Sequence, residues 1–174
     1  MAKRLKGKVA LVTGSSSGIG AGVAKAFARE GADLVLNYPN KAEEREIWNV
    51  QKAIEALGRK ALVVKADVSV EAQVKRMVKA ALQEFGQIDI LVNNAGGSPN
   101  RMMPASFIDP PQEVWGPYLD MNLGGVIHCS HAVISGRCDR GWGRIISRSA
   151  DAARGGSRGT SVYGAAARGR EGWT

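Results

Sequence analysis

The stretch from Val9 to Gly20 constrains this chain more than any other. It reads Val-Ala-Leu-Val-Thr-Gly-Ser-Ser-Ser-Gly-Ile-Gly, so an apolar run typical of a buried strand leads into glycines and then into a helical pattern. Glycine permits positive φ angles and lets a ligand approach the backbone closely. A strand, a glycine-rich turn and a helix N-terminus together present backbone N–H groups to a phosphate. The first prediction is therefore a nucleotide-binding turn.

Apolar runs alternate with helical patterns along the whole chain. The predicted strands are Val9–Thr13, Asp33–Asn37, Ala61–Lys65, Ile88–Asn93 and Arg144–Ser147. Their apolar residues are continuous rather than alternating, which indicates strands covered on both faces. Strands that alternate with helices predict parallel βαβ units with right-handed crossovers. We therefore expect an α/β fold: a three-layer Rossmann-type sandwich with strand order 3-2-1-4-5 and a ligand at the carboxyl ends of the strands.

Helical periodicity fills the segments between these strands. The predicted helices are Ala21–Glu30, Lys41–Leu57, Val70–Phe85 and a region from Pro111 and Pro117 to about Ile134. The buried faces are predicted from apolar spacing to contain Ile47, Val50, Ile54 and Leu57 in the second helix, and Val74, Met77, Val78, Ala81, Leu82 and Phe85 in the third. Ser69 is the expected N-cap of the third helix, and Gly86 is its expected stop.

Length and composition fit one globular domain over residues 1–174, with 44% hydrophobic residues. No apolar run approaches the roughly 20 residues of a membrane helix, and Met1–Lys8 lacks the features of a signal peptide. Cys129 and Cys138 form neither a disulfide framework nor a metal-ligand pattern, so we expect no metal and a cytoplasmic location. The arginine-rich segment Gly136–Thr174 could contact nucleic acid, but no recognition motif accompanies it, and a solvated surface is the preferred interpretation.

Several motifs, taken in order, resemble the short-chain dehydrogenase/reductase family. The turn matches that family's Thr-Gly-x-x-x-Gly-Ile-Gly, and other motifs follow at the expected places. These are Thr13–Gly20, Asp67-Val68, Asn93-Asn94-Ala95-Gly96, Asn122 and Tyr163. The resemblance extends from about Lys6 to the end of the chain, and within the family it points to 3-oxoacyl-carrier-protein reductases and glucose dehydrogenases.

The resemblance implies hydride transfer between a nicotinamide cofactor and a small carbonyl or alcohol substrate. The cofactor-binding residues that it implies are Gly14, Ser16, Ser17, Gly18, Ile19, Gly20, Asn37, Asp67, Val68, Asn94, Ala95 and Gly96. Asp67 could instead be a turn residue at a strand end. Asn93 and Asn94 could cap strand ends, a role that is compatible with cofactor binding.

The choice between NADP and NAD depends on the end of the second strand. An acid there would hydrogen-bond the ribose 2′-OH of NAD and repel a 2′-phosphate. The chain has Asn37-Tyr38-Pro39-Asn40-Lys41 instead, without an acid, and Lys41 could reach a phosphate. We expect NADP in preference to NAD, with Lys41 as an ordinary solvated residue being the alternative.

The resemblance weakens in the catalytic set. It implies that Tyr163 transfers the proton and that Asn122 completes a water relay, but the family's lysine is replaced by Ala167 and its serine by Ala150. Ser149 is the nearest surviving hydroxyl. Arg168 is a poor substitute for the lysine, because one helical step turns a side chain by about 100°. We expect strongly reduced activity, and a catalytically impaired cofactor-binding protein is the alternative.

The chain supplies five strands, whereas the family usually has two more that cover the substrate and form much of the subunit interface. A complete fold is expected to be a homo-oligomer, a dimer or tetramer, without nucleic-acid or membrane partners. The chain could be a truncated paralogue, a fragment or a sequence corrupted near its end, and its lysine-free tail favours the third. Residues 97–104, with Met102 and Met103, are expected to form one wall of the substrate pocket.

Overall fold

The central element is a parallel sheet of five strands in the order β3-β2-β1-β4-β5. The computed structural model describes residues 3–97, 113, 115–155 and 159–172. The strands are β1 (Val9–Val12), β2 (Asp33–Tyr38), β3 (Ala61–Lys65), β4 (Ile90–Asn93) and β5 (Arg144–Ser147). Every neighbouring pair is parallel. The fold class and the strand order predicted from the sequence are confirmed.

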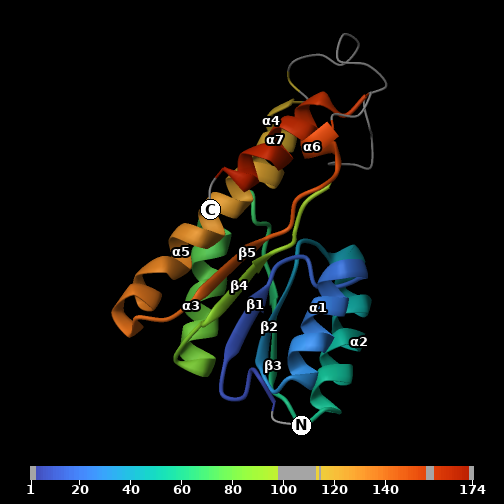
Figure 1. The fold of residues 1–174 in the computed structure, drawn as a ribbon. Coiled ribbons are helices and arrows are strands. Elements are labelled where there is room, and N and C mark those ends of the chain that lie inside the picture. Colours follow the sequence, from blue (N-terminus) through green and yellow to red (C-terminus); the bar gives the residue numbers. More distant parts are fainter. Residues whose placement is uncertain (1–2, 98–112, 114, 156–158, 173–174) are drawn as a thin grey trace.

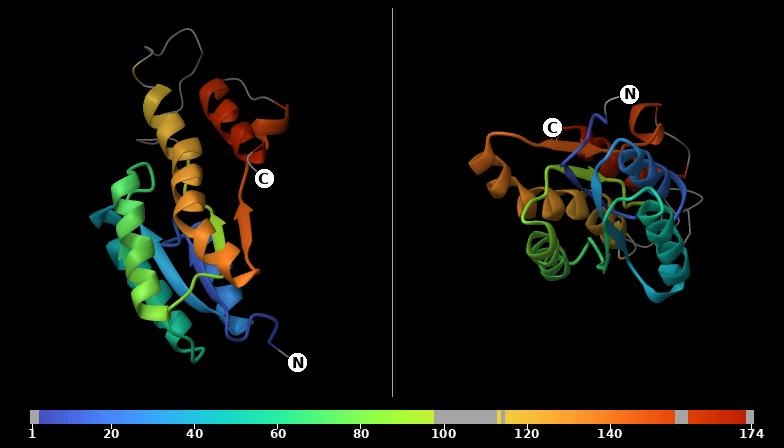
Figure 2. Two further views of the ribbon diagram at one scale, coloured as in Figure 1. Left: turned by 90° about the vertical axis from the view of Figure 1, so that its left-hand side faces the viewer. Right: turned by 90° about the horizontal axis from the view of Figure 1, so that it is seen from below.

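Helices cover the two faces of this sheet and form the outer layers (Figures 1 and 2). One face carries α1 (Gly18–Arg29) and α2 (Glu44–Glu55), and the other carries α3 (Glu71–Phe85) and α5 (Gly125–Arg140). The remaining helical segments are η1 (Lys41–Glu43), α4 (Trp115–Leu119), the π-helical turn η4 (Asp120–Gly124), α6 (Ala152–Gly155) and α7 (Ser161–Glu171). Figure 1 shows α4, α6 and α7 beyond the carboxyl ends of the strands, so this end of the sheet is where a site can be enclosed.

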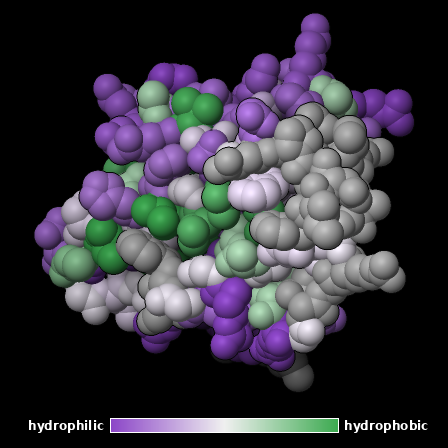
Figure 3. All heavy atoms as spheres, turned by 90° about the horizontal axis from the view of Figure 1, so that it is seen from above, coloured by the Kyte–Doolittle hydropathy of each residue, from purple (hydrophilic) through white to green (hydrophobic). Residues whose placement is uncertain are grey.

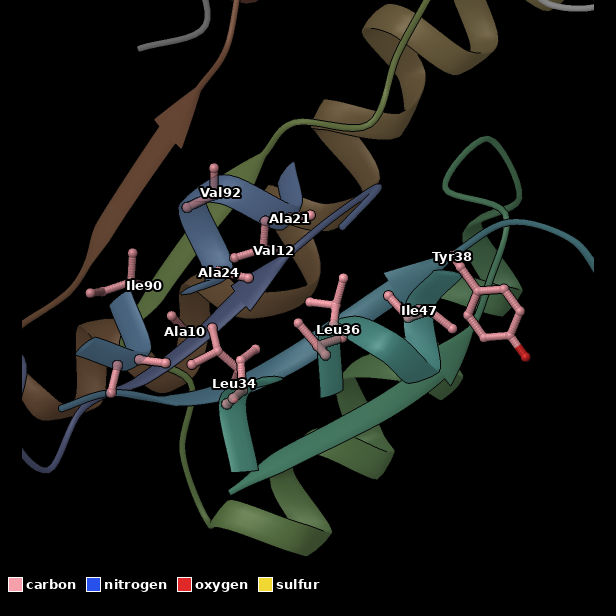
Figure 4. Close-up of a cluster of buried hydrophobic side chains, with 14 residues drawn as sticks. Ala10, Val12, Ala21, Ala24, Leu34, Leu36, Tyr38, Ile47, Ile90 and Val92 are labelled. Atoms are coloured by element: carbon pink, nitrogen blue, oxygen red, sulfur yellow. The ribbon is translucent and has the colours of Figure 1, made fainter. Parts of the chain in front are cut away.

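The alternation of side chains along the strands divides the core into two clusters. Ala10 and Val12 of β1 face α1 and α2, together with Leu34 and Leu36 of β2 (Figure 4). The intervening Leu11 packs in the second cluster, on the side of α3 and α5. Full burial of one aliphatic side chain of this size contributes about 1.5–3 kcal/mol. Continuous apolar strands are thus explained by two covered faces, as the sequence predicted.

Several helix boundaries differ from the prediction. The second helix starts with the separate 3₁₀ turn η1, and α5 continues beyond Ile134 to Arg140. Leu57 and Leu82 are 39% and 41% exposed, so their assignment to the buried faces was wrong. Leu57 lies past the end of α2. The spacing of apolar residues in the sequence does not specify the residue at which the helix ends.

The prediction of two covered faces was wrong for the two edge strands: β3 is half-buried with Lys65 exposed, and β5 is the more open of the two. The residues of β5 alternate between exposed and half-buried, and Ile146 is 45% exposed. β5 is the edge strand beside β4, so it has a neighbour on one side only. Among the described helices, none is long and apolar enough to cross a membrane.

Candidate functional site

The glycine turn after β1 has a backbone that only glycine accepts without strain. Gly14 and Gly18 have φ angles of +60° and +53°, which L-residues with a side chain adopt at a cost. A Cβ atom on Gly20 would overlap the carbonyl oxygen of Gly14 and lie 2.5 Å from Nδ2 of Asn94. The first turn of α1 therefore packs directly on the loop, and its backbone N–H groups face the same space as the turn.

Two asparagines fasten this turn to the neighbouring strands. Asn94 Nδ2 donates to the carbonyl oxygens of Thr13 and Gly14, each at 2.9 Å. Asn37 Oδ1 accepts from the Gly14 N–H at 3.1 Å, and Asn37 Nδ2 donates to the Ala66 carbonyl at 2.8 Å. These bonds connect the carboxyl ends of β1, β2, β3 and β4. Asn94 is thus a strand-end cap, the role that the sequence left open beside cofactor binding.

A cavity of about 690 Å³ lies on these strand ends. All the predicted cofactor-binding residues except Gly18 line it, and the other lining residues are Pro39, Asn40, Glu43, Ala66, Gly97, Met121 and Arg148. Ile19 at its edge is 60% exposed. Figure 3, which looks onto this end of the molecule, shows apolar side chains near the middle of the face, with hydrophilic ones along its upper, left and lower margins. The tertiary structure therefore collects residues from four strand ends into one site.

The carboxylate of Asp67 forms a local turn. Its Oδ1 accepts from the Ser69 N–H at 2.9 Å and from the Ser69 hydroxyl at 2.7 Å. Ser69 therefore does not cap α3, whose N-cap is Val70, and the predicted cap was wrong. The Ser69 hydroxyl donates to the carboxylate of Asp67, two residues earlier, instead of accepting from a backbone N–H at the start of α3. Asp67 is a strand-end turn residue, and it also lines the cavity.

A second carboxylate reaches the cavity from η1. The Ser16 hydroxyl, in the glycine turn, donates a hydrogen bond to Oε2 of Glu43. Ser16 is buried and Glu43 is half-buried, whereas Lys41 is exposed and is not among the described residues that line the cavity. The sequence prediction sought an acid directly at the end of β2 and missed Glu43, which reaches the site only because η1 turns back.

Asn122, the predicted relay residue, is buried in the π-helical turn η4. Its Oδ1 accepts from the Gly97 N–H at 2.8 Å, and its Nδ2 donates to the carbonyl oxygens of Gly97 at 2.8 Å and Tyr118 at 3.0 Å. Single π-helical turns inside helices often occur at functional sites, because they displace the backbone ladder. Asn122 therefore holds the start of the loop after β4 rather than lining the cavity itself.

Arg170 is a central residue of this end of the fold, and the sequence prediction missed it. The guanidinium is 1% exposed and donates through Nε and Nη2 to the carbonyl and Oδ1 of Asn122, and through Nη1 to the Arg148 carbonyl at 2.9 Å. Burial lowers the pKa of Arg170, the charge interaction with Tyr163 raises it, and the like charge of Arg148 lowers it again. Arg170 lies two helical turns after Tyr163, on the same side of α7, and this spacing was the available signal.

The other predicted catalytic residues lie on and beside α7. Tyr163 is half-buried, and Ala167 is fully buried. The Ser149 hydroxyl donates to the Ala167 carbonyl at 3.0 Å, so it contacts the backbone of α7. The fold brings Tyr163, Arg170 and Asn122 together, but none of them, nor Ser149, is among the described residues that line the cavity. Of the predicted pocket wall at residues 97–104, Gly97 lines the cavity, and the remainder with Met102 and Met103 lies outside the described residues.

Comparison with known proteins gives a consistent family. The sequence profile described as short chain dehydrogenase matches residues 8–174. An uncharacterized oxidoreductase of Methylorubrum extorquens is 42% identical over 129 residues, which cover 74% of this chain and 50% of that protein. The chain spans about half the length of this relative.

Two solved structures share the fold. A short chain dehydrogenase from Burkholderia cenocepacia in complex with NADP has a TM-score of 0.87 and 37% identity, with 98% of this chain and 67% of that chain covered. An NAD⁺-bound xylitol dehydrogenase has a TM-score of 0.91 and 28% identity, with 99% and 64% covered. One explanation accounts for the glycine turn, for the hydrogen bonds that Asn37 and Asn94 make to it, and for the matched profile. The chain belongs to the short-chain dehydrogenase family.

Proposed function

We propose that this chain is the cofactor-binding and catalytic part of an NAD(P)-dependent oxidoreductase that transfers hydride between a nicotinamide and a carbonyl or alcohol. The observation that carries the proposal is the close packing of the glycine turn, in which a Cβ on Gly20 would overlap the Gly14 carbonyl. The helix behind it, α1, has no acidic residue in its first turn, so its positive end is free to attract a phosphate. The relatives with bound NADP and NAD⁺ support the same cofactor class.

The lining of the cavity fits each part of a dinucleotide. The turn from Gly14 to Gly20 would hold the pyrophosphate, Asp67 and Val68 would contact the adenine, and Asn94 to Gly96 would border the nicotinamide half. When bound, the nicotinamide would supply or accept the hydride. The protein's own contribution is to orient this group and to exclude water beside it.

Proton transfer is assigned to Tyr163, with Asn122 as the relay residue and Ser149 as the nearest hydroxyl. Positioned proton donors of this kind contribute about 10²–10⁴-fold to a rate. A second candidate function is a cofactor-binding protein with little turnover. It is favoured by Ala150 and Ala167, which lack catalytic side chains, and by the engagement of the Ser149 hydroxyl with the α7 backbone.

We extend the proposal to the subgroup and the partners. The substrate is a small carbonyl compound or alcohol of the kind handled by 3-oxoacyl-carrier-protein reductases or glucose dehydrogenases, and the complete protein works as a cytoplasmic homo-oligomer. The arginine-rich segment is assigned to the fold rather than to nucleic acid. Two of its arginines, Arg137 and Arg170, are buried, which a solvated nucleic-acid arm would not require.

The test uses a matched pair of glycine variants on α1. Gly20→Ala should weaken the binding of NADH and NADPH, measured by fluorescence titration, at least tenfold because the new Cβ displaces the turn. Gly22→Ala is the control, since apart from the local backbone of its own helix no described heavy atom lies within 4 Å of its Cβ, and it should bind both cofactors like the wild type. If the wild type and both variants bind the cofactors equally well, the glycine turn does not form the cofactor site. Carbonyl-dependent NADPH or NADH oxidation then separates the enzyme from the second candidate.

A further inference from the structure

The carboxylate of Glu43 lines the cavity beside Ser16 of the glycine turn. The proposed function assigns this turn to the pyrophosphate and Asp67 and Val68 to the adenine, so the adenosine ribose between them would lie next to Glu43. Pro39 and Asn40 also line the cavity. Asn40 Oδ1 caps η1 by accepting from the Ala42 N–H at 2.9 Å, which fixes the short turn that carries Glu43. The hydrogen bond from the Ser16 hydroxyl then connects Glu43 to the glycine turn. Two separate segments therefore hold one carboxylate at the rim of the site.

We infer that Glu43 makes this site selective for NAD over NADP, an inference that rests on the proposed function. The Ser16 proton is already donated to Glu43, so both groups offer only acceptor atoms to a ligand. The 2′-OH and 3′-OH of a ribose are donors that suit such acceptors. A 2′-phosphate carries no comparable donor at neutral pH, and its charge would be repelled by the carboxylate.

The other charged groups around the cavity do not compensate for this repulsion. Its described lining contains the carboxylates of Glu43 and Asp67 and the guanidinium of Arg148. Arg148 donates to the Asn94 carbonyl at 3.2 Å, beside the end of β4, which belongs to the nicotinamide half. Lys41, the basis of the expected preference for NADP, is exposed and stands outside the described lining. Both carboxylates thus belong to the adenosine half.

Two small probes isolate this end of the site, because 5′-AMP and 2′,5′-ADP (adenosine 2′,5′-bisphosphate) differ only by the 2′-phosphate. The wild-type chain should bind 5′-AMP at least about tenfold more tightly than 2′,5′-ADP, measured by isothermal titration calorimetry at low salt. Glu43→Gln removes the charge and keeps the side-chain length. It should reduce the ratio to about threefold or less, mainly by tightening 2′,5′-ADP.

Glu44→Gln is the matched control, since it removes the same charge one residue later. Glu44 accepts from the Tyr38 hydroxyl and is not among the described cavity residues, so the ratio should stay that of the wild type. Circular dichroism melting confirms that both variants fold. A wild-type preference for 2′,5′-ADP, an unchanged ratio in Glu43→Gln, or an equal shift in Glu44→Gln would overturn the role of Glu43.

The outcomes also separate this inference from the proposed function. If 5′-AMP and 2′,5′-ADP bind equally well and Gly20→Ala abolishes the binding of both, the nucleotide site stands and only the selectivity is refuted. If neither probe nor NADH binds to the wild type, the proposed function fails, and the role of Glu43 fails with it.

Discussion

Replacing Arg170 by methionine tests how the far end of the chain is held to the rest of the fold. The guanidinium is 1% exposed and donates to two carbonyl groups and one amide oxygen. Hydrogen bonds from a charged donor contribute about 1.5–3 kcal/mol each, and relief of the buried charge offsets part of the loss. We expect Arg170→Met to lower the free energy of unfolding by about 2–4 kcal/mol.

Thermal unfolding followed by circular dichroism provides the measurement. A chain of this size loses about 2–4 °C of Tm per kcal/mol, so the variant should melt roughly 5–15 °C lower. Arg168→Met is the control, because Arg168 is exposed on the same helix and forms an i, i+3 ion pair with Glu171. It should change stability by less than about 1 kcal/mol. An Arg170→Met variant as stable as wild type, or equal losses in both, would refute the argument.

Three further predictions concern other groups. Burial raises the pKa of the Cys129 thiol to about 12, so at pH 8 a disulfide reagent should modify exposed Cys138 alone, and both cysteines only after denaturation. The double variant Ala150→Ser with Ala167→Lys should raise carbonyl-dependent cofactor oxidation about 10²-fold or more, and a rate no higher than wild type would contradict the assignment of these positions. Burial lowers the pKa of Arg137 to about 10. Its Nη1 and Nη2 are buried without a partner among the described residues, so Arg137→Met should stabilise the chain by about 1–2 kcal/mol in urea titrations at pH 7. This gain in stability should shrink above pH 10, because the folded wild type then loses the Arg137 proton that the unfolded chain still holds. A gain that grows with pH would contradict the role of the buried charge.

The glycine turn could be predicted residue by residue, since its conformation is specified locally. Positive φ angles at Gly14 and Gly18 favour glycine whatever packs around them. At Gly20 the requirement comes from the carbonyl of Gly14 in the same turn, which leaves no room for a Cβ. Gly86 likewise ends α3 in the left-handed conformation. Caps based on small polar residues were harder to predict, because Ser69 had an equally local alternative in Asp67.

The cation near Tyr163 could not be derived from the local pattern alone. The sequence directed attention to Ala167 and its neighbour Arg168, because the family places a lysine there. The structure instead buries Arg170 against Asn122, which is 48 residues distant in the chain. Such a contact depends on how α7 packs across the π-helical turn, and helical spacing alone does not specify which partner a long side chain reaches.

The sequence by itself determined the layers of the fold and the glycine turn, because backbone conformation and the burial of apolar faces are properties of short stretches. The strand order was predicted from the alternation of strands and helices along the whole chain. Only the tertiary structure decided which charges meet at the site. Glu43 reaches Ser16 because η1 folds back over the end of β2, and Arg170 reaches Asn122 because α7 packs on η4. Both contacts join segments that are remote in the chain, and a charge acts on whatever lies within a few ångströms rather than on its neighbours in sequence.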